Sequence, residues 1–137
     1  MPNERAIGNI ENVESSSATF NSKNYIYSGN NNADDVAWYD TNSGYKTHAV
    51  GKLVSNELGI YDMNGNVWEW YSDRFDENYY KNSSKLNPKG ASSGSNRVFR
   101  GGGWDGNATS CRASYRNGNE PTYLYNSLGF RVTAPLQ

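Results

Sequence analysis

The chain has 137 residues and a formal net charge of −1; 35% of its residues are hydrophobic, and 11 are Tyr and 4 are Trp. A domain of this length buries roughly two-thirds of its unfolded surface, so we expect one aromatic core under a polar, Asn-rich surface. The near-neutral charge lacks the basic field that binds nucleic acid, and no apolar run approaches the roughly 20 residues of a spanning helix. Nucleic-acid partners and membrane insertion are therefore not expected.

Residues 1–24 are polar, rich in Ser and Asn, and without helical periodicity, which predicts a poorly structured or loosely attached arm. They show no secretion-signal pattern. We expect one domain over residues 25–137. Residues 36–39 are an aromatic strand or one turn of helix, residues 40–44 a turn, and residues 48–50 a short extended piece.

Residues 59–70 predict two strands joined by a tight turn. Asn64 and Gly65 tolerate the positive φ that a hairpin turn requires. Alternation after the turn places Glu69 on the face of the strand opposite to Trp68 and Trp70, with Val67 beside the carboxylate.

Residues 71–96 mix charged, aromatic and turn-forming residues, which is typical of a long surface loop. Residues 97–100 predict a strand ended by three glycines that permit unusual dihedrals or close backbone approach, with Trp104 anchoring the turn. Residues 128–132 predict a last strand with Phe130 and Arg131 on opposite faces. The expected fold class is α+β, with short strands, long loops and little helix.

Three motifs stand in order along the chain: residues 59–70, Arg-Gly-Gly-Gly-Trp at 100–104, and Leu-Gly-Phe-Arg-Val at 128–132. Together they resemble the C-terminal part of the formylglycine-generating-enzyme (sulfatase-modifying-factor) family, and the resemblance runs from about residue 25 to 132. It implies a C-type-lectin-like fold.

The resemblance also implies a structural calcium ion, held by the side chains of Asp62 and Glu69 and the carbonyls of Gly65 and Val67. Calcium takes six to eight oxygen ligands of these kinds. The alternative is that Glu69 pairs with a buried arginine, Arg112 or Arg131, and that Asp62 caps the turn. The sequence leaves both open.

Oxidases of this family use two cysteine thiolates and copper, just after the glycine turn. Here Asp105 and Gly106 stand at the first position, and the single cysteine, Cys111, is interpreted as a small buried hydrophobe. Other members hold iron through histidines, but His48 is the single histidine and is interpreted as structural. We expect no copper, no iron and no enzymatic activity; an oxidase of the formylglycine-generating type is the alternative.

Residues 104–127 have the composition of an antibody-like surface, rich in Tyr, Ser, Gly and Asn. The resemblance includes a subgroup, the variable proteins of diversity-generating retroelements in bacteria and phages, in which adenines of Asn-type codons are mutated. Such codons cannot produce Lys, Gln, Met, Trp or Glu. Between positions 105 and 127 Glu120 alone violates that rule. An ordinary polar loop is the alternative.

The function expected is a receptor- or adhesin-type protein that binds a protein or other macromolecule, at the bacterial surface, secreted or on a phage; self-association and a structural module of a larger assembly stay open. Affinity is expected in Tyr123, Tyr125 and Tyr115. The candidate ligand-binding residues are Asp105, Gly106, Asn107, Thr109, Ser110, Ser114, Tyr115, Asn117, Asn119, Thr122, Tyr123, Tyr125 and Asn126. The expected scaffold residues are Trp104, Cys111, Arg112, Pro121, Gly129, Phe130 and Arg131.

Overall fold

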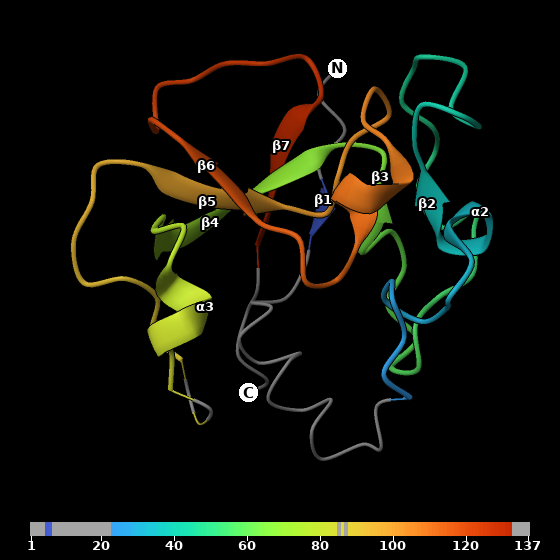
Figure 1. Cartoon of the computed structure of the whole chain (residues 1–137). Coiled ribbons are helices and arrows are strands. Elements are labelled where there is room, and N and C mark those ends of the chain that lie inside the picture. Colours follow the sequence, from blue (N-terminus) through green and yellow to red (C-terminus); the bar gives the residue numbers. More distant parts are fainter. Residues whose placement is uncertain (1–4, 7–22, 85, 87, 133–137) are drawn as a thin grey trace.

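A computed structural model of the chain describes residues 5–6, 23–84, 86 and 88–132. The expected polar arm therefore lies outside the described residues, apart from positions 5–6 and 23–24. The described part has short strands, long loops and little helix, as predicted (Figure 1). Its helices are α2 (Ala33–Val36), α3 (Tyr79–Asn82) and a 3₁₀ turn, η1 (Ala108–Cys111).

The main sheet has five strands in the order β1-β7-β4-β5-β6. Its members are β1 (Arg5–Ala6), β4 (Trp68–Arg74), β5 (Arg97–Arg100), β6 (Asn117–Asn119) and β7 (Leu128–Val132). β4 lies in the middle, antiparallel to β5 and parallel to β7, with Glu69 opposite both Arg100 and Gly129. The three sequence motifs thus become neighbours in one sheet.

The predicted hairpin at residues 59–70 is wrong. β3 (Asn64–Gly65) pairs in parallel with β2 (Ala37–Trp38) in a second sheet, and β4 then pairs elsewhere. Positive φ falls at Gly65 (70°) and Asn66 (67°), so the chain swings from one sheet to the other instead of folding back. A Cβ atom on Gly65 would lie 2.4 Å from the Trp38 carbonyl oxygen, which explains why glycine is needed there.

The later strand predictions are confirmed, since β5 and β7 have the predicted bounds. The loop predicted at 71–96 is shorter than expected, because β4 continues to Arg74 and α3 forms within it. Alternation along β4 is also confirmed. The rings of Trp68 and Trp70 both meet Phe99 edge-on, while Glu69 is buried on the opposite face.

The apolar core lies between α2, β2 and η1, and its members are Tyr27, Ala33, Val36, Ala37, Tyr39 and Cys111. Asparagine is not confined to the surface as expected, because Asn56, Asn64 and Asn66 are buried. The Asn66 side chain accepts from the backbone N–H of His48 (3.0 Å) and donates to its carbonyl (2.9 Å), as a neighbouring strand would. Buried amides thus hold the long loops where backbone pairing is absent.

The glycine turn behaves as predicted. Gly101 and Gly102 have φ of 91° and 77°, and a Cβ atom on Gly102 would lie 2.5 Å from the Cys111 sulfur. Trp104 anchors the turn through its backbone, because its N–H donates to the Asn66 carbonyl (2.9 Å) and its carbonyl accepts from the Ser43 hydroxyl (2.7 Å). The chain that follows therefore starts from a fixed point.

Candidate ligand-binding face

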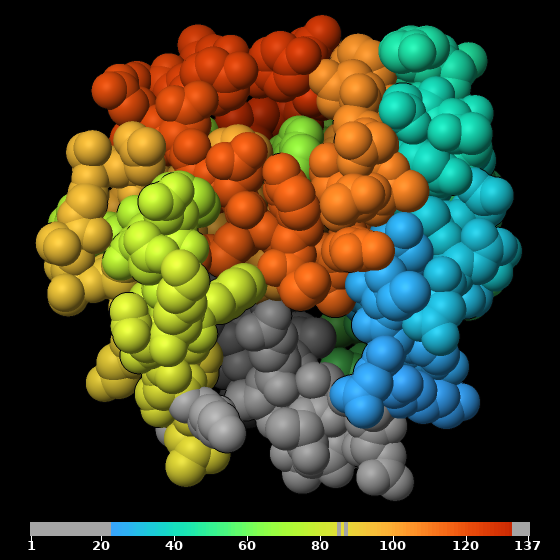
Figure 2. Space-filling view, in the orientation of Figure 1, coloured from blue at the N-terminus to red at the C-terminus, as the bar shows by residue number. Residues whose placement is uncertain are grey.

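Residues 104–127 cross from the α2–β2 side of the molecule to the main sheet. Cys111 packs η1 into the core, and β6 then pairs with β5 before the chain returns to β7. Figure 2 shows this segment, in orange to red, spread over the middle and upper part of one face. It is therefore a continuous surface, supported from behind at both ends.

None of the candidate ligand-binding residues is buried. Five are half-buried: Asp105, Gly106, Ser110, Tyr115 and Asn119. The other eight are exposed: Asn107, Thr109, Ser114, Asn117, Thr122, Tyr123, Tyr125 and Asn126. The structure thus gathers the predicted set on one surface segment.

Some of these residues also hold the segment in shape. The Asn107 side chain caps η1 by accepting from the backbone N–H of Ser110 (3.1 Å). The ring of Tyr115 packs on Trp68 at 5.9 Å, and its carbonyl accepts from the Arg100 guanidinium. Tyr115 therefore has a structural role in addition to any contact with a ligand.

The expected scaffold residues divide into two groups. Cys111 is fully buried, Trp104 and Gly129 are half-buried, and the side chain of Arg131 is almost fully buried. Arg112 and Pro121 are exposed, and Phe130 is 63% exposed. Burial supports the scaffold role for the first group only.

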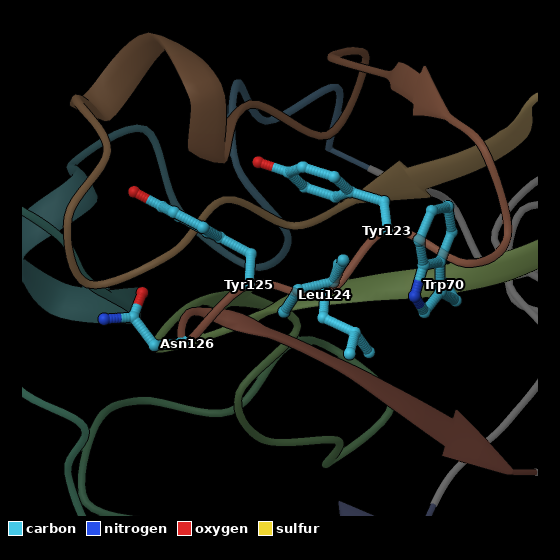
Figure 3. A pocket seen from close by; sticks show the side chains of 6 residues that line it. Trp70, Tyr123, Leu124, Tyr125 and Asn126 are labelled. Atoms are coloured by element: carbon cyan, nitrogen blue, oxygen red, sulfur yellow. The ribbon is translucent and has the colours of Figure 1, made fainter.

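A hollow of about 280 Å³ opens between the sheet and residues 104–127, which we call the display segment. Trp70 of β4 and Leu128 of β7 contribute the strand side, and residues 123–126 contribute the other. The rings of Tyr123 and Tyr125 lie nearly parallel, 6.0 Å apart between centroids and 19° between planes. Figure 3 shows both hydroxyl groups pointing the same way, with Tyr123 beside Trp70 and Leu124 between Tyr125 and Trp70.

Sequence reasoning missed three residues of this hollow: Trp70, Leu124 and Leu128. Strand alternation placed Trp70 on the face away from Glu69, which is the face that the display segment crosses, so a signal for Trp70 was present. Leu124 is 90% exposed and stands between two predicted contact residues, Tyr123 and Tyr125. Its position between them in the sequence could have indicated that Leu124 also belongs to the site.

A carboxylate lies beside the tyrosine pair. The Tyr125 hydroxyl hydrogen-bonds to the Asp105 carboxylate, and this bond, followed by the negative charge of Asp105, raises the pKa of Tyr125. Asp105 is thereby placed next to the hollow although it stands twenty residues earlier in the chain.

The Glu69 carboxylate lies against the guanidinium of Arg131, with Nε 2.9 Å from one oxygen. The same guanidinium donates to the Asp62 carbonyl (2.5 Å), while the Asp62 carboxylate accepts from the Gly51 N–H (2.7 Å). The two carboxylates are thus directed at different partners, as the ion-pair alternative expects for Glu69. Arg112, the other arginine considered, is exposed. The calcium site at Asp62, Gly65, Val67 and Glu69 stays a prediction.

Cys111 and His48 have the structural environments expected of them. Burial raises the pKa of the Cys111 thiol to about 12, so the thiol is protonated at neutral pH and behaves as a small buried hydrophobe. The His48 ring stacks on Trp38 at 3.9 Å, and its Nε2 lies 2.7 Å from the Ser43 carbonyl oxygen. Neither side chain belongs to a group of three His, Cys, Asp or Glu within the described part of the chain that could hold a metal ion.

The family model of the sulfatase-modifying factor enzyme 1-like domain matches residues 8–135. The chain belongs to this family. "Chaperone protein LppX" of Paenibacillus barcinonensis is 35% identical over 133 residues, covering 81% of the chain and 42% of the relative. The formylglycine-generating enzyme of Streptomyces coelicolor is 39% identical over 88 residues, covering 62% of the chain and 28% of the enzyme. The chain thus spans less than half the length of each.

Solved structures confirm the C-type-lectin-like fold class of the family. Variable protein 1 of Treponema denticola matches with a TM-score of 0.72 and 39% identity, covering 78% of the chain and 40% of that protein. PvdO of Pseudomonas aeruginosa matches with a TM-score of 0.60 and 30% identity, covering 70% and 38%. Within the described residues no helix has the length and apolarity needed to cross a membrane.

Proposed function

We propose that the chain is a non-catalytic, ligand-binding member of the family: a variable protein of the diversity-generating-retroelement type that presents residues 104–127 to a protein or other macromolecule. The observation that carries the proposal is the division of this segment into two sets. Every candidate ligand-binding residue has exposed surface, whereas Cys111 of the same segment is buried, as is Gly102 in the glycine turn just before the segment. The exposed side chains of such a surface can be substituted without altering the buried residues that hold the segment in place.

Likeness to variable protein 1 of Treponema denticola supports the same reading. The composition of residues 104–127 also suits a binding surface, because tyrosines bury large rings at low entropic cost and Ser, Gly and Asn adapt their hydrogen bonds. A cell-surface, secreted or phage-associated location goes with this proposal, since a macromolecular ligand must reach the face.

The oxidase alternative finds no support at its reaction centre. Copper-dependent chemistry of the family's kind needs a pair of accessible thiolates. The single cysteine is fully buried, and Asp105 and Gly106 occupy the place expected for the other. We therefore expect purified protein to take up neither Cu(I) nor Fe(II) stoichiometrically. Binding of one equivalent of either metal, together with oxygen consumption in the presence of a cysteine-containing peptide, would support the oxidase alternative instead.

A library experiment tests the proposal directly. The candidate ligand-binding residues are replaced together by residues reachable from Asn codons, and folding of each member is scored by protease resistance on a display platform. We expect most members to stay folded and some to bind chosen test proteins. In a matched control library, Gly102, Cys111 and Arg131 are varied instead, and most members should unfold. Equal losses in the two libraries would overturn the proposal.

The neighbouring DNA supplies an independent test. A variable protein predicts a nearby reverse transcriptase gene and a near-copy of the coding segment for residues 104–127 that differs only at adenines. Its absence from the complete genome would remove the diversification from the proposal and leave a binding protein with a fixed surface.

A further inference from the structure

We propose that the hollow between Trp70 and the Tyr123–Tyr125 pair is a subsite for a cationic side chain, an arginine of a protein ligand. This inference rests on the proposed function and names the chemistry of one part of its surface. The hollow combines a scaffold wall with a display wall. Trp70 and Leu128 belong to sheet strands, whereas Tyr123 and Tyr125 belong to the segment that would vary.

Three electron-rich rings line the hollow, those of Trp70, Tyr123 and Tyr125. The faces of such rings carry negative charge that attracts cations within about 6 Å, and tryptophan attracts them more strongly than tyrosine does. A planar guanidinium also stacks on aromatic faces, which a spherical ammonium group cannot do. The two tyrosine rings are nearly parallel and only 6.0 Å apart between centroids, so a guanidinium would stack on the outer face of one ring and not between the two.

Charge complementarity favours a cation over an apolar guest. The residues that line the hollow include no lysine or arginine. The Asp105 carboxylate interacts with the Tyr125 hydroxyl at the border of the hollow, and a guanidinium bound there could donate hydrogen bonds to this carboxylate. Leu124 and Leu128 supply the apolar surface on which the methylene stem of an arginine packs.

The size and the open walls of the hollow suit one side chain of a larger partner. Ligand pockets for drug-sized molecules usually enclose about 300–1,000 Å³ and bury most of the guest. This hollow has about 280 Å³, and its Tyr123, Leu124 and Tyr125 are 40%, 90% and 50% exposed. A side chain projecting from a larger partner fits an open site of this kind.

The test compares N-acetyl-arginine amide with N-acetyl-citrulline amide, its neutral isostere, and with N-acetyl-leucine amide. Binding to the full chain is followed by NMR through the indole N–H signal of Trp70, which is assigned with a Trp70→Phe variant. At low salt we expect arginine to bind about tenfold more tightly than citrulline or leucine. Equal affinity of the three amides, or tighter binding of leucine, would overturn the proposal.

Variants locate the effect. Tyr123→Ala and Tyr125→Ala should each weaken arginine binding severalfold, and Asp105→Asn should bring arginine close to citrulline. Tyr45→Ala is the matched control, because Tyr45 is 72% exposed but does not line the hollow. If the control weakens arginine binding as much as Tyr125→Ala, the site is wrong. If arginine does not bind selectively but the library of display-segment variants still folds and binds test proteins, the arginine subsite is rejected and the proposed function is retained.

Discussion

The guanidinium of Arg131 lies 2.9 Å from the Glu69 carboxylate, and both side chains are almost fully buried. Arg131 also donates to the Asp62 carbonyl and to the Met63 sulfur. One side chain of β7 thereby ties β4 to the segment that leads into β3. Two of the three sequence motifs thus meet at a single ion pair beneath the display face.

Removal of one partner of this pair is expected to be costly. Arg131→Ala should reduce the free energy of unfolding by about 3–5 kcal/mol, because it takes from Glu69 the cation that it faces in a buried site. Urea denaturation measures the loss. The exposed Arg112→Ala is the matched control and should change stability by less than about 0.5 kcal/mol.

A double-mutant cycle with Glu69→Gln separates the pair from its surroundings. The double variant should lose less than the sum of the two single losses, since neither charge then remains buried. Strict additivity would show that Arg131 acts through its carbonyl contacts instead of through Glu69.

The ion pair also yields an expectation for calcium. Since the guanidinium already faces Glu69 and the Asp62 carboxylate holds the Gly51 N–H, added calcium should leave the melting temperature unchanged. Differential scanning fluorimetry in calcium and in chelator measures this. If calcium raises the melting temperature and Asp62→Asn abolishes this increase, the calcium site that the family motif implies at Asp62 and Glu69 is established.

The two strands that sequence reasoning located well are β5 and β7, whose bounds matched. Alternation put Phe130 and Arg131 on opposite faces, but it did not reveal that Arg131 is the buried one and Phe130 the exposed one. The hairpin failed for a different reason. Asn64 and Gly65 correctly indicated positive φ in this region. Local dihedral angles do not show which strand pairs with β3, however, and its partner β2 lies 27 residues earlier in the chain.

The candidate site was predictable to a similar extent. Composition marked residues 104–127, and the structure found all of the candidates with exposed surface. The hollow was not predictable, because it arises where Trp70 and Leu128 of two paired strands meet the loop at 123–126. Contacts between segments so far apart depend on the register of the sheet, which a single sequence does not specify.

Gly102 should tolerate no side chain. Its φ of 77° and the 2.5 Å approach to the Cys111 sulfur predict that Gly102→Ala costs about 2–5 kcal/mol, from left-handed strain together with overpacking. Gly44→Ala is the matched control, since Gly44 has a φ of 60° but no heavy atom within 4 Å of the added carbon. It should cost only ~1 kcal/mol. Similar losses at both positions would mean that strain alone decides.

Arg116 is expected to fasten α3 to the display segment. Its guanidinium lies over the rings of Phe75, Tyr79 and Tyr80 at 5.0–5.5 Å and donates to the Asp76 carbonyl (2.7 Å). Arg116→Ala should cost about 1–2 kcal/mol and speed amide hydrogen exchange in residues 79–82. Unchanged exchange there would show that α3 is held by other contacts.

The thiol of Cys111 gives a pH dependence with a definite sign. Its pKa is raised from 9.0 to about 12 by burial, so the folded chain keeps the thiol neutral where the unfolded chain ionises. The contribution to stability is complete below pH 9 and is lost as pH rises toward 12, by ~4 kcal/mol over the whole interval. Cys111→Ala should flatten this slope in urea denaturation at stepped pH. Iodoacetamide should leave native protein unmodified at pH 8 and label it in urea; rapid labelling of the native protein would contradict the buried, neutral thiol.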